Sequence, residues 1–361
     1  MVSNTLKIEK EYDIVIKGAY GAANFGDDAL LYSLLSNISK DKNVAVVGKK
    51  NNYIQNIAPH VDFYTYNDNV KLKTKVLLWG GGTQFYDFFS LKFFFKKLLS
   101  VFNNPNIALK KISKKNPGVS IQFNKEVYLS IGFGPFFNRK KEQTLAKKLG
   151  LANKIFVRDP LSYTNLSKYI DKDSIIVTED ICLLDKNNYV IPNIKRNGRI
   201  CIIVRDWSYD SSSIHIDKAI RFYQDFEEQS KIDFILFAQD KQCIKKFEEN
   251  NIPYIQWDPL NFSIMEFSKL IAEYSLIISS RYHGVVFGII HSIPTIAIEI
   301  EPKLKQVHQD YLSQVSLWKK PYEFNLLSHL IATSNTLQAE PKDNAYSLKT
   351  IVKSIEEEFC E

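Results

Sequence analysis

A polar hexapeptide, SSRYHG at residues 279–284, lies between apolar runs at residues 274–278 and 285–290. A buried strand followed by polar residues and then an apolar helix places those residues at the carboxyl edge of a sheet, where open α/β sheets bind ligands. Arg281 and His283 then stand at a helix start, which favours an anion. Arginine offers a planar fork to carboxylate or phosphate, and histidine exchanges a proton near neutral pH. The hexapeptide predicts an anion site with acid–base capacity.

Two more arginines end apolar runs in the same way. Arg158 follows residues 154–157 and Arg205 follows residues 200–204, and an aspartate comes directly after each arginine. Such a pair is often only a local ion pair. Because the carboxyl ends of parallel strands meet at one edge, both arginines can instead converge with Arg281 on one cleft. The three together favour an anion site.

A glycine-rich loop at residues 18–28 joins an apolar strand to a helical pattern. It lacks the GxGxxG spacing of a dinucleotide fingerprint and the GK[ST] ending of a P-loop. Asn24 and Asp27 either approach a phosphate or sugar or serve only as a turn and a helix cap. The sequence GGGT at residues 80–83 also follows an apolar run, and its glycines permit close approach of a ligand or of a neighbouring loop.

Other chemical patterns are missing from the sequence. No GxSxG elbow indicates a hydrolase, and no HxxxH pair or acidic cluster indicates a metal site. The cysteines show no CxxC spacing, which argues against a zinc site or a disulfide scaffold; they are Cys182, Cys201, Cys243 and Cys360. We therefore expect no metal.

Strands and helical patterns alternate along the chain, which predicts parallel sheets built from βαβ units. The strands are expected at residues 13–17, 44–47, 76–79, 127–131, 154–157, 200–204, 234–237, 276–278 and 295–299. A polar stretch at residues 185–198 divides them into two similar α/β halves with a cleft between them. The expected domains are residues 1–188 and 189–340, and a helix within residues 341–361 is expected to pack back on the body.

The composition suits a globular protein with two cores. Of 361 residues 45% are hydrophobic, and 47 Lys+Arg against 40 Asp+Glu give a net charge of +7, too small a basic excess to indicate nucleic-acid binding. The polar N-terminus is not a signal peptide, and no apolar run reaches the roughly 20 residues that span a bilayer. We expect a cytoplasmic protein. Segment 88–102 interleaves apolar residues with lysines and is either an interfacial membrane helix or a core helix with solvated lysines.

Together these motifs resemble the polysaccharide pyruvyltransferases. The resemblance rests on GxxGxxNxGD at residues 18–27, GGG at 80–82, VRD at 157–159 and SSRYHG at 279–284 with Pro294 beyond it, and it runs from about residue 14 to about residue 305. It implies two Rossmann-like domains facing a cleft, similar to GT-B glycosyltransferases. It also implies transfer of pyruvate from phosphoenolpyruvate to a sugar of a bacterial-type exopolysaccharide, capsule or cell-wall glycan precursor, with formation of a cyclic ketal and release of phosphate.

The resemblance further implies roles for single residues. Phosphoenolpyruvate is the co-substrate, and no cofactor is implied. The residues expected to bind this donor are Arg158, Arg281, Tyr282 through its backbone, His283 and Arg205. His283 is the expected general acid, and Asp27 orients or deprotonates the attacking hydroxyl. The acceptor side comprises Asn24, Asp27, Gly81 and Gly82. Relatives often have leucine at the position of Tyr282, and Lys303 matches a common lysine whose role is open.

The acceptor is a glycan or a lipid-linked oligosaccharide, and in the second case segment 88–102 would contact the anionic inner face of the membrane.

Two alternatives to pyruvyl transfer stay open. A nucleotide-sugar glycosyltransferase of the same architecture would bind its nucleotide in the second domain, with Asp240 or Glu299 on the ribose. A glycan-binding homologue without catalytic activity is the other.

Overall fold

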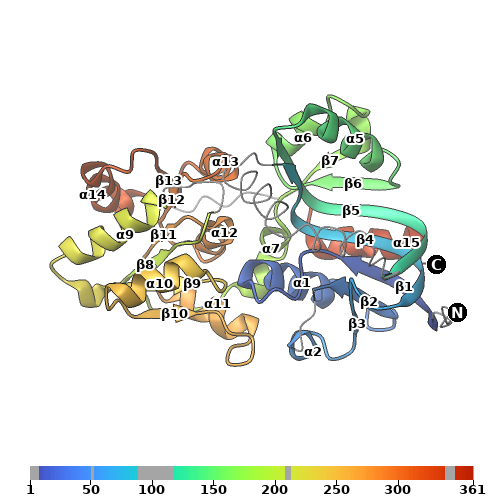
Figure 1. The fold of residues 1–361 in the computed structure, drawn as a ribbon, viewed down its shortest axis with the longest axis horizontal. Coiled ribbons are helices and arrows are strands. Elements are labelled where there is room, and N and C mark those ends of the chain that lie inside the picture. Colours follow the sequence, from blue (N-terminus) through green and yellow to red (C-terminus); the bar gives the residue numbers. More distant parts are fainter. Residues whose placement is uncertain (1–7, 50–52, 88–117, 208–212, 338–345, 361) are drawn as a thin grey trace, which may run out of the picture.

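The computed structural model describes residues 8–49, 53–87, 118–207, 213–337 and 346–360. Within these residues the chain forms two domains, each built on a parallel β-sheet with helices packed against it (Figure 1). The predicted α/β class with parallel sheets is confirmed. Segment 88–102, which the sequence leaves open as an interfacial membrane helix or a core helix, lies outside the described residues.

The first domain holds a seven-stranded sheet of described residues in the order β3-β2-β1-β4-β5-β6-β7. Its strands are β1 (Ile8–Lys17), β2 (Val44–Gly48), β3 (Asp62–Thr65), β4 (Val70–Asp87), β5 (Ser120–Phe136), β6 (Lys154–Val157) and β7 (Ile175–Val177). The buried valine-rich β2 is typical of a parallel strand covered on both faces. The helices are α1 (Phe25–Asn37), α2 (Ile54–Ile57), α5 (Arg139–Leu149), α6 (Pro160–Leu166), η1 (Lys172–Ser174), α7 (Ile181–Leu184) and α8 (Lys186–Tyr189).

The second domain holds a six-stranded sheet of described residues in the order β10-β9-β8-β11-β12-β13. Its strands are β8 (Ile200–Ile203), β9 (Ile232–Leu236), β10 (Tyr254–Gln256), β11 (Leu276–Ser279), β12 (Thr295–Ile298) and β13 (Val315–Trp318). The helices are α9 (Ile214–Asp225), η2 (Gln229–Lys231), α10 (Lys241–Glu249), α11 (Ile264–Ala272), α12 (Tyr282–Ile290), α13 (Pro302–Asp310), α14 (Phe324–Thr333) and η3 (Ser334–Thr336).

Both sheets share the strand order of doubly wound dinucleotide-binding folds, in which the first and fourth strands are neighbours. The chain leaves these two strands in opposite directions across the sheet, and ligands bind in the crevice outside their carboxyl ends. In the first sheet that crevice lies beside the loop after β1. In the second it lies beside Arg205, which follows β8, and beside the hexapeptide that follows β11.

The glycines at residues 80–82 lie inside β4 and do not end a strand, so the predicted strand end at residue 79 is wrong. Gly81 and Gly82 have φ values of 60° and 77°, yet Gly82 pairs with Ile131 of β5 and the ladder continues to Asp87. A Cβ on Gly81 would lie 2.8 Å from Ile181 Cδ1. The left-handed backbone and this close packing both require glycine at position 81.

Phe25, the first residue of α1, joins the two domains. Its ring is buried among aromatic side chains of the second domain, with centroid distances of 4.9 Å to Phe237, 5.2 Å to Trp257, 4.8 Å to Phe267 and 4.7 Å to Phe287. Its N–H donates to the carbonyl of Phe237 at 2.8 Å. The start of α1, a helix of the first domain, is therefore also held by the second domain through ring contacts and a backbone hydrogen bond.

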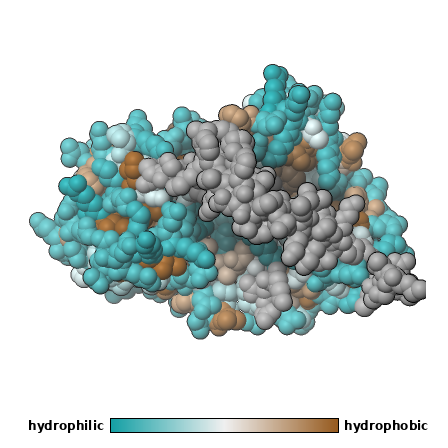
Figure 2. Space-filling model, in the orientation of Figure 1, coloured by the Kyte–Doolittle hydropathy of each residue, from teal (hydrophilic) through white to brown (hydrophobic). Residues whose placement is uncertain are grey.

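The C-terminal helix α15 (Leu348–Phe359) returns to the first domain, where it lies near β1 and β4 (Figure 1). Glu356 accepts the backbone N–H of Ser39 at 2.8 Å and its hydroxyl at 2.7 Å. Lys154 forms an ion pair with Glu358. Hydrophilic residues cover most of the described surface on the face in Figure 2, with the hydrophobic ones scattered among them.

Candidate active site

The N-terminus of α1 lies against the hexapeptide of the second domain. Asn24 caps this helix: its side-chain oxygen accepts the N–H of Gly26 at 3.3 Å, and its amide donates to Asp27 Oδ2 at 2.7 Å. A Cβ on Gly26 would lie 2.2 Å from His283 Nδ1, and one on Gly82 would lie 3.9 Å from Asp27 Oδ1. The fold thus gathers Asn24, Asp27, Gly82 and His283 around one helix end.

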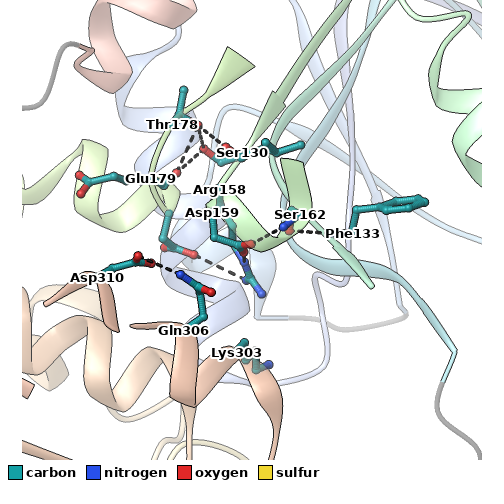
Figure 3. Close-up of polar contacts among 12 residues, drawn as sticks. Ser130, Phe133, Arg158, Asp159, Ser162, Thr178, Glu179, Lys303, Gln306 and Asp310 are labelled. Carbon is teal, nitrogen blue, oxygen red and sulfur yellow. Dashed lines mark hydrogen bonds and ion pairs between the residues drawn. The ribbon is translucent and has the colours of Figure 1, made fainter. Parts of the chain in front are cut away.

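Arg158 extends from the carboxyl end of β6 into the space between the domains, with only 3% of its side chain exposed. Its Nε lies 3.3 Å from Asp159 Oδ2, and its Nη1 lies 3.9 Å from Asp180 Oδ2. The Tyr282 ring centroid is 4.4 Å from the guanidinium carbon. Asp159 also caps α6 by accepting the N–H of Ser162 at 2.6 Å (Figure 3). These contacts hold a buried positive charge in one orientation.

Asp180, a residue that sequence analysis missed, pairs with His283. Its Oδ2 lies 3.7 Å from His283 Nε2, and neither atom has a hydrogen-bond partner among the described residues. Burial alone would raise the pKa of Asp180, yet the charges of His283 and Arg158 and the N–H of Cys182 hold that pKa below its usual value. Asp180 therefore stays ionised at neutral pH and places a buried negative charge beside the His283 ring.

Replacing Asp180 by asparagine is expected to lower kcat about 10- to 100-fold, the worth of a hydrogen bond to a charged group. The amide keeps the size of the side chain but loses the charge that faces His283. Steady-state kinetics would show the loss in kcat with a smaller change in KM for the anionic donor. A loss of activity that is accompanied by a lower melting temperature would instead indicate a purely structural role.

Lys303, Glu301 and Arg205 form a second charged group, in the second domain. Lys303 Nζ lies 3.1 Å and Arg205 Nη1 lies 3.5 Å from the same oxygen, Glu301 Oε1. Burial lowers the pKa of Lys303 to about 8; Glu301 opposes this shift, whereas Arg205 and Arg158 add to it. The Lys303 ammonium also lies 5.6 Å from the centroid of the Tyr282 ring. Lys303 can thus lose its charge at a mildly alkaline pH, at which an ordinary lysine stays protonated.

Arg281 is placed differently from the other predicted donor-binding residues. Its guanidinium contacts the Asp240 carboxylate, and Asp240 in turn accepts the N–H of Asp206 at 3.1 Å. Burial and the charge of Arg281 lower the pKa of Arg205. Arg281 and Arg205 therefore do not line the cavity described below, whereas Arg158 and Tyr282 do.

A cavity of about 210 Å³ opens between the domains beside Arg158. It is lined by Arg158, Asp159, Pro160, Val177, Thr178, Glu179, Asp180, Leu183, Tyr282, Lys303, Gln306, Val307, Asp310 and Tyr311. A smaller adjoining opening shares Arg158, Asp159, Lys303 and Gln306. Cationic groups from both domains thus meet at the junction of two openings, an arrangement suited to an anionic ligand.

The described residues contain no group of three or more histidine, cysteine and acidic side chains placed to hold a metal ion. Across the same part of the chain, none of the helices has the length and apolar character needed to cross a membrane.

A family comparison relates this arrangement to known proteins. The sequence model of the polysaccharide pyruvyl transferase family matches residues 24–302, a span that contains the α1 N-terminus, Arg158, Asp180 and the hexapeptide. The chain belongs to the polysaccharide pyruvyl transferase family. The predicted family is thereby confirmed, and membership of this family supports a transferase. A sequence search matched no curated protein.

Solved structures share the two-domain fold of this chain at low sequence identity. The UDP-GlcNAc 2-epimerase of Methanocaldococcus jannaschii, in complex with UDP-GlcNAc and UDP, has a TM-score of 0.58 at 12% identity, covering 96% of this chain and 99% of that one. Staphylococcus aureus MnaA with UDP has a TM-score of 0.57 at 12% identity, covering 97% and 96%. Anabaena HepE with UDP and glucose has a TM-score of 0.56 at 11% identity, covering 96% and 99%. The predicted GT-B-like fold is confirmed.

Proposed function

We propose that this member of the polysaccharide pyruvyl transferase family moves pyruvate from phosphoenolpyruvate to two hydroxyls of one sugar, forming a cyclic ketal and releasing phosphate. The acceptor is a bacterial-type exopolysaccharide, capsule or cell-wall glycan precursor, free or lipid-linked. The observation that carries the proposal is the placement of Arg158 at the cavity, between Asp180 and Tyr282 and close to Lys303. Phosphoenolpyruvate needs cations for a carboxylate and a phosphate, and a proton donor for its methylene carbon.

The donor binds where the positive groups meet. Arg158 offers a planar fork to the carboxylate or the phosphate, and Lys303 adds a compact charge from the second domain. The N-terminus of α12, which begins at Tyr282, contributes unpaired backbone N–H groups and the positive end of the helix dipole. Arg281 and Arg205 support this region through their charges.

The reaction then needs one proton donor and one proton acceptor. His283 donates its proton to the methylene carbon as a sugar hydroxyl oxygen bonds to C2 of the donor. The hydroxyl proton passes to a carboxylate; Asp27 is predicted for this role, and Asp180 is a second carboxylate near the imidazole, at 3.7 Å. A second hydroxyl of the same sugar displaces phosphate from C2, and its proton leaves with the phosphate. The products are a ketal and inorganic phosphate, without oxidation or reduction.

Mass spectrometry tests the reaction directly. Candidate glycosides are incubated with the chain and phosphoenolpyruvate, and the acceptor should gain the mass of one pyruvate less one water as phosphate is released. Phosphoenolpyruvate should also raise the melting temperature, because a ligand that binds only the folded state stabilises it. A rise with UDP and none with phosphoenolpyruvate would contradict the proposal and favour a nucleotide-sugar enzyme.

Use of phosphoenolpyruvate is expected to decline at alkaline pH through Lys303. Its pKa of about 8 means that the ammonium is charged below pH 8 and neutral above it. Because only the charged form attracts the donor, kcat/KM for phosphoenolpyruvate should fall about tenfold between pH 7 and pH 9. The Lys303→Met variant should have a lower kcat/KM without this alkaline fall. The exposed Lys245→Met change serves as the control, and an unchanged pH profile in Lys303→Met would refute the assignment.

A further inference from the structure

A buried carboxylate in the first turn of α1 connects the two domains. Asp28 is completely buried, and its Oδ1 accepts the hydroxyl of Tyr53, which precedes α2 in the first domain, at 2.7 Å. Its Oδ2 accepts the indole N–H of Trp257, which follows β10 in the second domain, at 3.0 Å. Each oxygen of this carboxylate therefore serves as the acceptor for one domain.

The same hydrogen bonds extend to the loop that precedes α1. The Tyr53 hydroxyl accepts the backbone N–H of Ala23 at 2.8 Å. Ala23 has a left-handed backbone with a φ of 48°, which a residue other than glycine adopts only where its surroundings hold it. Three residues later, Gly26 packs so closely on His283 that a Cβ there would lie 2.2 Å from the imidazole Nδ1. Asp28 thus holds the chain on both sides of Gly26, through Tyr53 before it and through α1 after it.

The ionised form of Asp28 lowers the stability of the fold. Among the described residues, the groups that act on its charge are the Tyr53 hydroxyl, the Trp257 N–H and the carboxylate of Asp27 on the same helix. Burial and the Asp27 charge raise the pKa of Asp28 from 3.8 to about 7, and the two hydrogen bonds oppose this rise. Because the pKa is higher in the folded state, the stability that this group contributes is greatest in acid and is lost as the pH rises to 7.

The two donors that face Asp28 explain why a carboxylate stands there. An ionised carboxylate accepts at both oxygens, whereas an amide of the same size accepts at one end and donates at the other. An indole N–H can only donate. Asparagine at position 28 therefore cannot accept from both Tyr53 and Trp257, and a buried donor that loses its acceptor is costly.

We propose that Asp28 is a positioning residue for His283: its carboxylate, bonded by Tyr53 in the first domain and by Trp257 in the second, sets how closely the start of α1 packs on the imidazole. The inference rests on the proposed pyruvyl transfer for the role of His283 as proton donor. A general acid works only within hydrogen-bonding reach of its target, so a small displacement of the ring lowers turnover more than it weakens donor binding.

Kinetics and stability of Asp28→Asn in the full chain test the role. We expect kcat for pyruvyl transfer to fall about tenfold, with KM for phosphoenolpyruvate little changed. At pH 8 the melting temperature should not fall, because the buried charge is gone, and relative to this variant the wild type should lose stability as the pH rises from 5 to 8. Asp41→Asn, at a side chain that is 72% exposed, is the matched control and should change nothing. A kcat that falls together with the melting temperature at pH 8 would mark Asp28 as a structural contact only and overturn the inference.

Hydrogen exchange followed by mass spectrometry tests the link between Asp28 and the hexapeptide without the reaction. Asp28→Asn and Tyr53→Phe should each speed exchange about tenfold in peptides that cover residues 21–28 and 280–286, and leave exchange in the two sheets unchanged. Tyr53→Phe keeps the charge of Asp28 and removes the hydroxyl that joins it to Ala23. The Asp41→Asn control should exchange like the wild type.

The outcomes separate the positioning role from the reaction. If the wild-type chain transfers pyruvate, a lower kcat together with faster exchange in these two segments alone supports the role. An unchanged kcat, unchanged exchange or uniformly faster exchange overturns the role and leaves the proposed function standing. If no acceptor is pyruvylated, the proposed function fails, and exchange alone decides by the same criterion whether Asp28 holds α1 against the hexapeptide.

Discussion

Replacing His283 by glutamine is expected to lower kcat for pyruvyl transfer by about 10²–10⁴-fold, because general acid catalysis by one group has that value. Glutamine has a volume similar to that of histidine, so it should fit in the same tight space. In the wild-type chain His283 packs directly on Gly26, because a Cβ added to Gly26 would lie 2.2 Å from the imidazole Nδ1. Glutamine has no proton to give to the methylene carbon of the donor. Phosphate release measured at saturating phosphoenolpyruvate would show the loss, with KM for the donor changed far less.

The same helix offers a matched control in His291, at the C-terminus of α12. Its Nε2 is 2.9 Å from Ser268 Oγ, and burial lowers its pKa to about 4, so the ring is neutral at physiological pH. His291→Gln should keep near wild-type turnover. A His283→Gln variant that turns over at the wild-type rate would remove His283 from the chemistry.

Truncating Phe25 to alanine is expected to reduce the free energy of unfolding by about 3–5 kcal/mol, the usual cost of emptying a buried phenylalanine site. Four aromatic rings of the second domain surround this side chain, at centroid distances of 4.7–5.2 Å. Urea unfolding followed by tryptophan fluorescence is a suitable measurement, because Trp257 packs directly on Phe25.

Phe137→Ala provides the comparison, because Phe137 is 69% exposed and its truncation should change the unfolding free energy by less than about 0.5 kcal/mol. Phe25→Ala should also lower activity, since Phe25 precedes Gly26, which packs against the His283 ring. Equal stabilities of the two variants would show that Phe25 does not hold the domains together.

Much of the fold follows from local pattern. Apolar runs ended by Arg158, Arg205 or the hexapeptide indicate buried parallel strands, and the structure has β6, β8 and β11 there. The glycines of β4 mislead because a local turn signal competes with pairing to β5, which the sequence does not reveal. Strand pairing across a sheet is a tertiary interaction and overrides local preference.

Fewer of the contacts in the candidate site can be predicted from the sequence. Asp180 follows β7, which at three residues is too short to show a period. An acidic residue directly between apolar residues 175–177 and 181–184 is the signal that could have found it. The partners of Arg281 and Lys303, namely Asp240 and Glu301, follow from packing alone. Glu179 and Tyr311 meet only because the two domains close on each other.

The return of α15 to the first domain affects how the protein is made on the ribosome. Residues 200–318, which contain the whole second sheet, are synthesised before the helix that completes the first domain. Domains usually fold in order of synthesis, but here the earlier domain must wait for the later one. Its surface around Ser39 stays uncovered until Glu356 has been synthesised.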